Sequence, residues 1–596
     1  MQLCGGVKGG VEAAVHGLRA VWEDNETEAV LLVDARNAFN CMNRKTGLQN
    51  TGIICPELFT YLNNTYQKPS DLFVAGSEGL KIKSQEGTTQ GDTTAMAFYA
   101  LSLMKLIKDA KTKAPDAKEV FYADDGAAGG KLGVRKEAEE LFPNVNITTE
   151  GSRYLGSFIG TEEGTKKFVQ DQVKLWLRDL EGLSNIAQHE PHLSYCAYIY
   201  GTSKRWNYLM RTTPQISEHL EDIECYIIKR LIPSFTGHKV GIDHRAIFTL
   251  PVRHGGLAIE NPVEIADREY QNSLRMTEVL WKAIFNQEQS IRIADTEDQK
   301  LIDDIKKQKE ETFIQVKFEA ISHLSPKDAR FVALACEKGA SSWLSTLPLE
   351  EYGFSLNKQE FKDAVAMRYN FPIEGRSKTC ICGEENTQDH SLICKRGGFT
   401  SIRHNTIRDT TANLLEKICY GVEIEPALLP VGNRKLPPGS NVKDGARSDI
   451  VARGFWTPLD KAYFDIRVLH PGAKSNENKS FDKMYNQHEE EKKRQYNSRI
   501  RDIEHGTFTP LVFSTSGGMS KECNKFMKKL SEGLSFRTQQ AYPDTINYVR
   551  RRLRFELLKT TLISIRGHRG RFFQRPIDLE EIDLNLIILK REERRK

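Results

Sequence analysis

The 596-residue sequence has no apolar run long enough to span a bilayer, and its start, MQLCGGVKGG, lacks the apolar stretch of a secretion signal. Its net charge is only +5, so the chain is not uniformly basic, and affinity for nucleic acid would have to come from local groups of Lys and Arg. From these absences we expect no membrane-spanning segment and a nuclear or cytoplasmic location.

Cysteine lacks a regular pattern: eight of the eleven cysteines are scattered, and the total is odd. This argues against a disulfide framework and for a reducing compartment. The other three stand beside a histidine in the pattern C-x-C-x7-H-x3-C, formed by Cys380, Cys382, His390 and Cys394. Three thiolates and one imidazole suit a closed tetrahedral site for a structural Zn²⁺, and the polar segment GEENTQD offers no core that would bury unliganded cysteines. The spacing predicts that His390 and Cys394 share one helical face.

The first part of the chain is expected to mix strands and helices. Its length exceeds that of one core, so we expect two or three domains. Helices are predicted at 11–23 and 91–110, an apolar, buried strand ends at Asp34, and VFYADDGAAGG is typical of a hairpin. Residues from about 165 to 235 and from 263 to 345 are mostly helical in pattern.

A second unit is predicted from about residue 370. The cysteine cluster is followed by a helix at 402–420, a loop rich in Pro and Gly, two strands, a charged helix at 480–504 and a further strand. Strand, strand, helix and strand with helices outside indicate an α/β or α+β unit.

Three acidic residues of the first part lie where metal ligands occur. Asp34 ends the apolar strand, and Asp124 and Asp125 occupy the tight turn of FYADDG. Nucleotidyl transfer needs two divalent metals, and carboxylate oxygens are their natural ligands. Each segment alone is more readily an exposed turn, but their joint order around the Gly-rich segment QEGTTQGDTTAM favours a metal site.

These segments resemble motifs A, B and C of reverse transcriptases, especially those of non-LTR (LINE-like) retrotransposons. The resemblance implies a right-hand polymerase palm in which Asp34 and Asp124 bind the catalytic Mg²⁺ or Mn²⁺ ions and Asp125 supports them. It also implies that Phe39 excludes a 2′-hydroxyl and so favours deoxynucleotides.

Further parts of the resemblance concern substrate handling. Gln90 and Gly91 would line the nucleotide and template position, the hairpin EGSRYLGSFIG would grip the primer, and the helices after it would form a thumb. Two elements of the family are reduced: the chain begins inside the domain, so the fingers are truncated, and the segment between the hairpin acids and RYLG is short.

A second acidic pair stands in GARSDIVARGFWTPLDKAYFDIRVLHP. Asp449 opens one expected strand and Asp465 lies in the next, which resembles the PD-(D/E)XK core of restriction-like nucleases. That core binds one or two Mg²⁺ ions and activates water against a phosphodiester. Arg467 stands where the family usually has a lysine, and arginine can stabilise phosphate charge but is a poor proton carrier.

The helix after this pair offers replacements for the missing lysine. Lys492 or Lys493 can share a helical face with Tyr496, because they precede it by four and three residues. Glu416 could add a metal ligand from the preceding helix. His404 could be a spare zinc ligand, or it could support the helix or contact phosphate.

A reverse transcriptase followed by a cysteine–histidine knuckle and a restriction-like endonuclease resembles the early-branching, site-specific non-LTR retrotransposons. The implied fold is a multi-domain α+β protein in which the palm and helical thumb precede a zinc knuckle and an α/β nuclease core. The implied domains are a palm at 1–165, a thumb-like region at 166–262, a helical linker at 263–370, a knuckle at 371–410, the endonuclease at 411–568 and a charged tail at 569–596.

The implied function is RNA-directed DNA synthesis primed at a nicked DNA target. Its partners would be an RNA template, a DNA primer or target, and dNTPs. Two alternatives stay open on the sequence: a nuclease whose palm is only a scaffold, and a non-enzymatic nucleic-acid-binding remnant that uses its Lys and Arg clusters.

Overall fold

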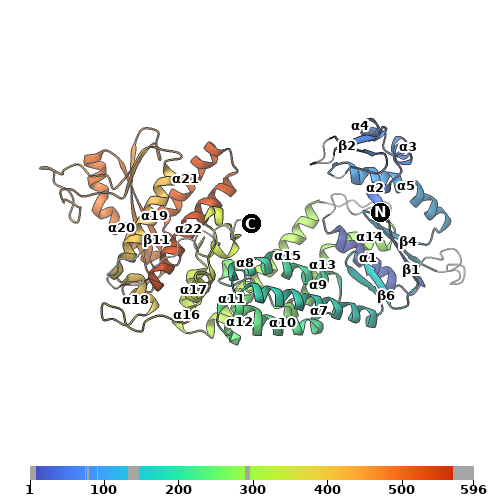
Figure 1. Cartoon of the computed structure of the whole chain (residues 1–596), viewed down its shortest axis with the longest axis horizontal. Helices are drawn as coiled ribbons and strands as arrows, with labels where there is room; N and C mark the ends of the chain where they lie inside the picture. Colours follow the sequence, from blue (N-terminus) through green and yellow to red (C-terminus); the bar gives the residue numbers. More distant parts are fainter. Residues whose placement is uncertain are drawn as a thin grey trace, which may run out of the picture. The chain divides into compact units, whose positions relative to one another are not determined.

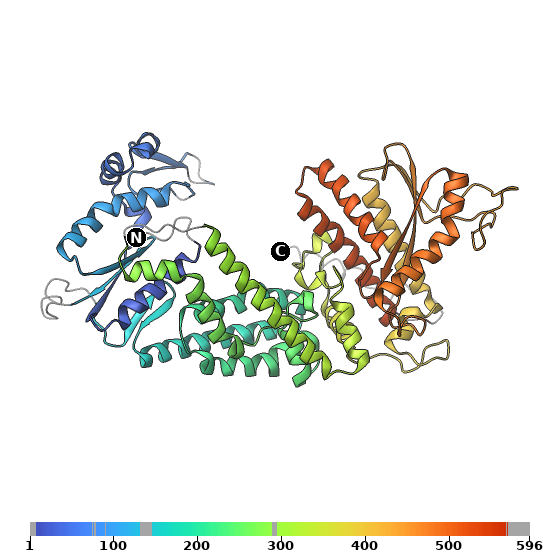
Figure 2. The ribbon, with the colours of Figure 1, turned by 180° about the vertical axis from the view of Figure 1, so that it is seen from behind.

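The computed structural model describes residues 8–73, 76, 79–89, 91–131, 146–288, 295–567 and 569. The chain forms two compact units, Met1–Leu324 and Ser325–Lys596, which Figures 1 and 2 show from opposite sides. Both units combine helices with sheet, so the protein is a multi-domain α+β chain. None of the described helices is both long and apolar enough to cross a membrane.

The first unit is organised around helix α1 (Gly10–Glu23), which packs on a three-stranded antiparallel sheet. The strand order is β1 (Ala29–Asp34), β5 (Asp125–Gly130), β4 (Lys118–Tyr122). Apolar side chains at helical spacing on α1 meet Val120 and Ala127 of the sheet in one buried core. The hairpin expected from VFYADDGAAGG is confirmed as β4 and β5.

Strand β1 is not buried, contrary to the expectation from its apolar sequence. Leu31 and Val33 are 42% and 52% exposed, whereas the alternate residues Val30 and Leu32 pack against the core. The cause is the position of β1, an edge strand of a sheet that has one face on the core and the other on the surface. Because side chains alternate between the two faces, every second residue of β1 is exposed.

A separate small core lies between β1 and β4 in the chain. Phe98 and Tyr99 of α5 pack against Leu62 and Tyr66 of α4 and against residues of α2. The helix expected at 91–110 is α5, shifted by a few residues. The elements here are α2 (Ala38–Cys41), α3 (Arg44–Ile54), α4 (Pro56–Tyr66), β2 (Ser70–Phe73), β3 (Lys81–Ser84) and α5 (Ala95–Lys113).

The rest of the first unit is a hairpin followed by helices. Buried Arg19 of α1 donates from Nη2 to the carbonyls of Phe158 and Thr212, both at 3.0 Å, and so anchors α1 to both. These elements are β6 (Gly151–Tyr154), β7 (Ser157–Gly160), α7 (Glu162–Ile186), α8 (Pro191–Ala197), α9 (Ser203–Thr212), α10 (Glu221–Tyr226), α11 (Ile232–Thr236), α12 (Ile242–Thr249), α13 (Pro262–Met276), α14 (Glu278–Phe285) and α15 (Asp295–Ser322).

The stretch 263–370, expected to be one helical linker, is divided between the two units. Helices α13 to α15 belong to the first unit, and α16 (Pro326–Ala335) and α17 (Lys358–Tyr369) belong to the second. In the second unit, Arg566 of α22 (Tyr542–Arg566) donates hydrogen bonds to both carboxylate oxygens of Asp363 of α17, at 2.6 and 2.7 Å.

The second unit contains a four-stranded sheet in the order β11 (Thr507–Ser514), β10 (Lys461–Leu469), β9 (Ile450–Arg453), β8 (Tyr420–Ile424). Strands β8, β9 and β10 are antiparallel, and β11 runs parallel to β10 after the crossover helix α20 (Phe481–Arg499). Strand β8 is an addition to the expected elements, because the helix predicted at 402–420 is α19 (Phe399–Leu415) and ends before it.

Helices cover both faces of this sheet. Phe464 and Ile466 of β10 face a core with α19, α21 (Lys521–Thr538) and α22, whereas Tyr463 of β10 faces Ile500 and the residues of α20. Figure 1 shows the strands between α20 on one side and α21 and α22 on the other. Because side chains alternate along a strand, Asp465 points to the α20 side.

Candidate metal centre and acidic sites

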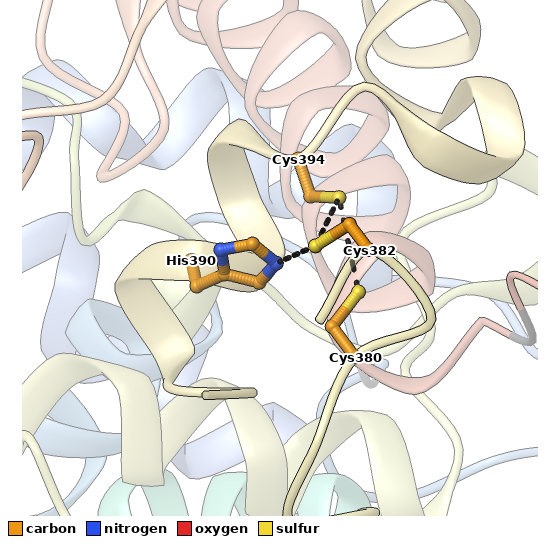
Figure 3. A group of neighbouring side chains, drawn as sticks. All are labelled: Cys380, Cys382, His390 and Cys394. Carbon is orange, nitrogen blue, oxygen red and sulfur yellow. Dashed lines mark hydrogen bonds between the residues drawn. The ribbon is translucent and has the colours of Figure 1, made fainter. Parts of the chain in front are cut away.

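The Cys and His side chains of the predicted zinc site converge in the second unit. Figure 3 shows Cys380, Cys382, His390 and Cys394 around one point, and their four ligand atoms all lie within 4.8 Å of one another. The Sγ atoms of Cys380 and Cys394 are 3.8 Å apart, and Cys382 Sγ lies 3.3 Å from His390 Nε2. A tetrahedron with Zn–S bonds of about 2.3 Å has S–S edges of about 3.8 Å, so this cluster can bind a metal such as zinc.

Local hydrogen bonds hold the ligands in place. Helix α18 (Gln388–Ile393), which carries His390, is capped by Thr387, whose hydroxyl accepts from the His390 N–H at 3.0 Å. Arg376 donates to the carbonyls of Asn386 and Thr387, closing the loop between the ligand pairs. These hydrogen bonds within the protein therefore largely fix the positions of the ligand side chains.

Cys394 does not share a helical face with His390, as the spacing predicted. Helix α18 ends at Ile393, and Cys394 is extended, with φ −63° and ψ 125°. The extended residue turns its Sγ back toward Cys380, while its N–H still bonds the His390 carbonyl at 2.9 Å.

The cluster favours a thiolate at one ligand. Burial raises the pKa of the Cys380 thiol, but hydrogen bonds from the Cys382 backbone and from the neighbouring His390 and Cys side chains lower it more, to about 6. A thiolate is the form of cysteine that ligates metal.

The second site is built around Asp449, just before β9. Its Oδ2 accepts hydrogen bonds from the Ile466 N–H at 2.5 Å and from His404 Nε2 at 3.1 Å. His404 Nε2 also lies 3.1 Å from the Ile466 carbonyl, so this nitrogen carries the proton. The hydrogen bond to Asp449 raises the pKa of His404, and His404 thus orients the acid instead of serving as a spare zinc ligand.

Strands β9 and β10 are antiparallel and pair Ile450 with Phe464. Asp449 directly precedes Ile450 and Asp465 directly follows Phe464, so the two acids lie beside each other. Asp465 is 3% exposed, and Lys492 Nζ of α20 is 2.6 Å from its Oδ1. Burial and then the charge of Asp449 raise the pKa of Asp465 to about 6, against the opposing effects of Lys492 and His404. A buried acid this costly to ionise, next to another acid, suits a cation-binding position.

The other predicted residues of this site are placed differently. Lys493 points to Glu522 of α21, with Nζ 3.2 Å from Oε1, so it does not reach the acids. Tyr496 packs with its ring 5.6 Å from Lys492 Nζ. Arg467 shares the strand face of Asp465 and is exposed, and Glu416 is an exposed residue at the end of α19.

In the first unit, the register of the sheet brings two predicted metal ligands together. Asp34 of β1 pairs directly with Asp125 of β5, and Asp124 sits in the two-residue turn between β4 and β5. Burial, then Asp124 and Asp34, raises the pKa of Asp125. Within the described part of the chain, however, the three carboxylates do not form a group placed to hold a metal ion, as the Cys and His side chains do.

Two of the three predicted nucleotide-handling residues, Phe39 and Gly91, lie in the described part of the chain. The Phe39 ring packs at a tilt against Tyr99, with the ring centroids 4.7 Å apart. The Phe39 carbonyl accepts from the Thr88 N–H at 2.6 Å, which ties α2 to the Gly-rich segment. Gly87 is required there, because a Cβ would lie 2.3 Å from the Asn40 carbonyl oxygen. Gly91 has φ +90° and open space around it, and Gln90 lies outside the described residues.

The sequence has basic clusters, of which EKKRQYNSRIR at 491–501 is one, and some of their residues stabilise the fold instead of forming a solvated face. Arg499 is fully buried and donates to the carbonyls of Asn441, Lys443 and Leu429. The last two basic clusters, RGHRGRFFQR at 566–575 and KREERRK at 590–596, lie largely or wholly outside the described residues.

Comparison of the chain with models of known protein families gives no match, and comparison with curated proteins gives none. The functional conclusion therefore depends on the geometry of the three sites.

Proposed function

We propose that the second unit is a divalent-metal-dependent endonuclease that nicks DNA, in a protein of the site-specific non-LTR retrotransposon type. The observation that carries this proposal is the convergence of Asp449, Asp465 and Lys492 from three elements of one sheet-and-helix unit. The element order α19, β8, β9, β10, α20, β11 also agrees with a restriction-like core.

The residues have separable roles in this proposal. Asp449 and Asp465 would hold Mg²⁺ or Mn²⁺, which when bound supplies an activated water and charge stabilisation. His404 and the Ile466 N–H fix the Asp449 carboxylate. Lys492 offsets the charge of Asp465 and would donate a proton or stabilise the charge on the phosphate. The zinc cluster would act structurally, since all four ligand positions are filled by the protein.

The test is nicking of supercoiled DNA by the full chain with Mg²⁺ or Mn²⁺. Asp465→Asn is expected to lower the nicking rate by on the order of a thousandfold, because the site loses one of its two carboxylates. Asp460→Asn is the matched control: Asp460 lies in the turn between β9 and β10, is exposed, and should leave the rate within about twofold. Nicking that survives in Asp465→Asn, or no nicking at all, would contradict the proposal.

The pairing of Asp34 with Asp125 favours a second candidate function, RNA-directed DNA synthesis in the first unit. Asp34 and Asp124 would hold the two metal ions, with Asp125 supporting them. RNA template, DNA primer and dNTPs would be the substrates.

Primer extension on an RNA template with dNTPs and Mg²⁺ or Mn²⁺ tests this second function. Extension should fall by at least about a hundredfold in Asp124→Ala and stay within about twofold in Asp116→Ala, an exposed acid just before β4. If extension is absent while nicking is present, the protein is a nuclease whose first unit is a scaffold.

A further inference from the structure

The second unit contains a cavity of about 340 Å³ that neither acidic site nor the zinc cluster uses. Its walls come from α16, α17, α18, α22 and the segments that directly follow β10 and β11. A cavity of this size can enclose a small organic group. Its apolar lining includes Phe331, Leu334, Trp343, Met367 and Leu392.

Positive charge lies in the same walls. Arg330, Arg368 and Arg554 all line the cavity, as does Lys327, which is paired with Asp389 at 2.9 Å. Arg330 donates to two backbone carbonyls, at 3.0 and 3.1 Å, which do not neutralise its charge. The cavity therefore combines an apolar wall with guanidinium groups, the combination that suits an anion with a flat apolar body.

Arg554 carries the strongest indication of a ligand. It is 8% exposed, its Nε donates to the Ala340 carbonyl at 2.7 Å, and its Nη1 is buried without a partner among the described residues. Burial and then the charge of Arg368 lower the pKa of Arg554 to about 9. Glu337 is the acid whose charge acts on Arg554, but burial raises its pKa to about 7, so it offsets the arginines incompletely. Two carboxylates also line the cavity: Asp389 is paired with Lys327, and Glu477 is exposed. A buried donor without an acceptor is costly, and an anion would satisfy it.

We propose that this cavity binds one nucleotide unit, with the phosphate at Arg554 and the base against the apolar wall. The inference builds on the proposed nuclease function, because the cavity wall at His470 follows the strand that carries Asp465. Five residues of strand separate the two, or about 16 Å. A nucleic-acid strand held at the acidic pair could place a nucleotide a few positions away in the cavity.

Calorimetric titration of the full chain with thymidine 5′-monophosphate, without divalent metal, tests the cavity. The nucleotide should bind, and thymidine alone and inorganic phosphate alone should each bind at least about tenfold more weakly. Arg554→Met should weaken nucleotide binding about ten- to a hundredfold, because a charge-assisted hydrogen bond is lost. Arg551→Met removes the same charge from the same helix, outside the cavity lining, and should change binding by less than about twofold.

A second variant guards against misfolding of Arg554→Met. Met367→Trp fills part of the cavity and changes none of the Arg or Lys residues that line it. It should also weaken binding at least about tenfold. Equal binding of thymidine and its monophosphate, equal losses in Arg551→Met and Arg554→Met, or no binding of the nucleotide would each overturn the inference.

Two further arms separate this inference from the proposed nuclease. Asp465→Asn should keep nucleotide binding even where nicking is lost, so failure of the one is distinguishable from failure of the other. A 5′-phosphorylated tetrathymidylate identifies the source of the ligand: tighter binding than the monophosphate indicates a unit of a strand, and weaker binding indicates a free nucleotide. Either result supports the shared chemistry.

Discussion

Replacing Lys492 with methionine is expected to slow DNA nicking by at least about a hundredfold, whereas the same change at Lys493 should leave the rate within about twofold. The two lysines are neighbours on α20 but point in different directions. Lys492 Nζ lies 2.6 Å from the buried carboxylate of Asp465, and Lys493 Nζ lies 3.2 Å from Glu522 on α21. Single-turnover nicking of a supercoiled plasmid measures both variants.

The pair is informative because each variant loses one positive charge from the same helix. A general weakening of DNA binding would slow both, and that outcome would contradict a specific role for Lys492. Lys492→Arg adds a check on the chemistry, because arginine keeps the charge beside Asp465 but is a poor proton carrier. If Lys492 donates a proton, Lys492→Arg folds like the parent and nicks as slowly as Lys492→Met.

Replacing Cys382 with serine is expected to reduce bound zinc from about one per chain to less than about a tenth. Cys382 Sγ lies 3.3 Å from His390 Nε2 and 4.0 Å from Cys394 Sγ, so its loss opens the cluster. Because zinc binding contributes to folding, the second unit should lose about 4 kcal/mol of stability, or about 10 °C in its unfolding midpoint. Elemental analysis and thermal unfolding measure the two effects.

Cys225→Ser is the matched control, since Cys225 is an exposed thiol of the first unit. It should retain about one zinc per chain and the parent's unfolding midpoint. Treatment of the parent with a strong chelator should reproduce the loss in Cys382→Ser, and added Zn²⁺ should reverse it. Equimolar zinc in purified Cys382→Ser would contradict the assignment of the cluster.

What the sequence predicts well in this chain is local. The zinc ligands lie within fifteen residues, and the acids of the β4–β5 hairpin stand at a turn whose flanking apolar runs define it. Strand β8 was not predicted because it is short, begins soon after α19 and is largely exposed, so its burial pattern carries little alternation.

The assembly of the second acidic site depends on contacts distant in sequence. The sequence left Lys492 and Lys493 equivalent, because the helical face toward Asp465 is set by how α20 packs on the sheet. The bond between His404 and Asp449 joins residues 45 positions apart. No spacing rule identifies such a pair, although an isolated histidine before an acidic strand pair is the signal that could have suggested it.

Asp389 links the Cys–His cluster to the sheet of the second unit. It immediately precedes His390 of the cluster, and its Oδ1 lies 2.9 Å from Nε2 of His470, the residue directly after β10. His470 in turn bonds the Thr515 hydroxyl at 2.8 Å, just after β11. Hydrogen bonds thus connect the ends of β10 and β11 to Asp389, the neighbour of His390. A change that disrupts the Cys–His cluster should therefore also perturb the sheet that carries Asp465.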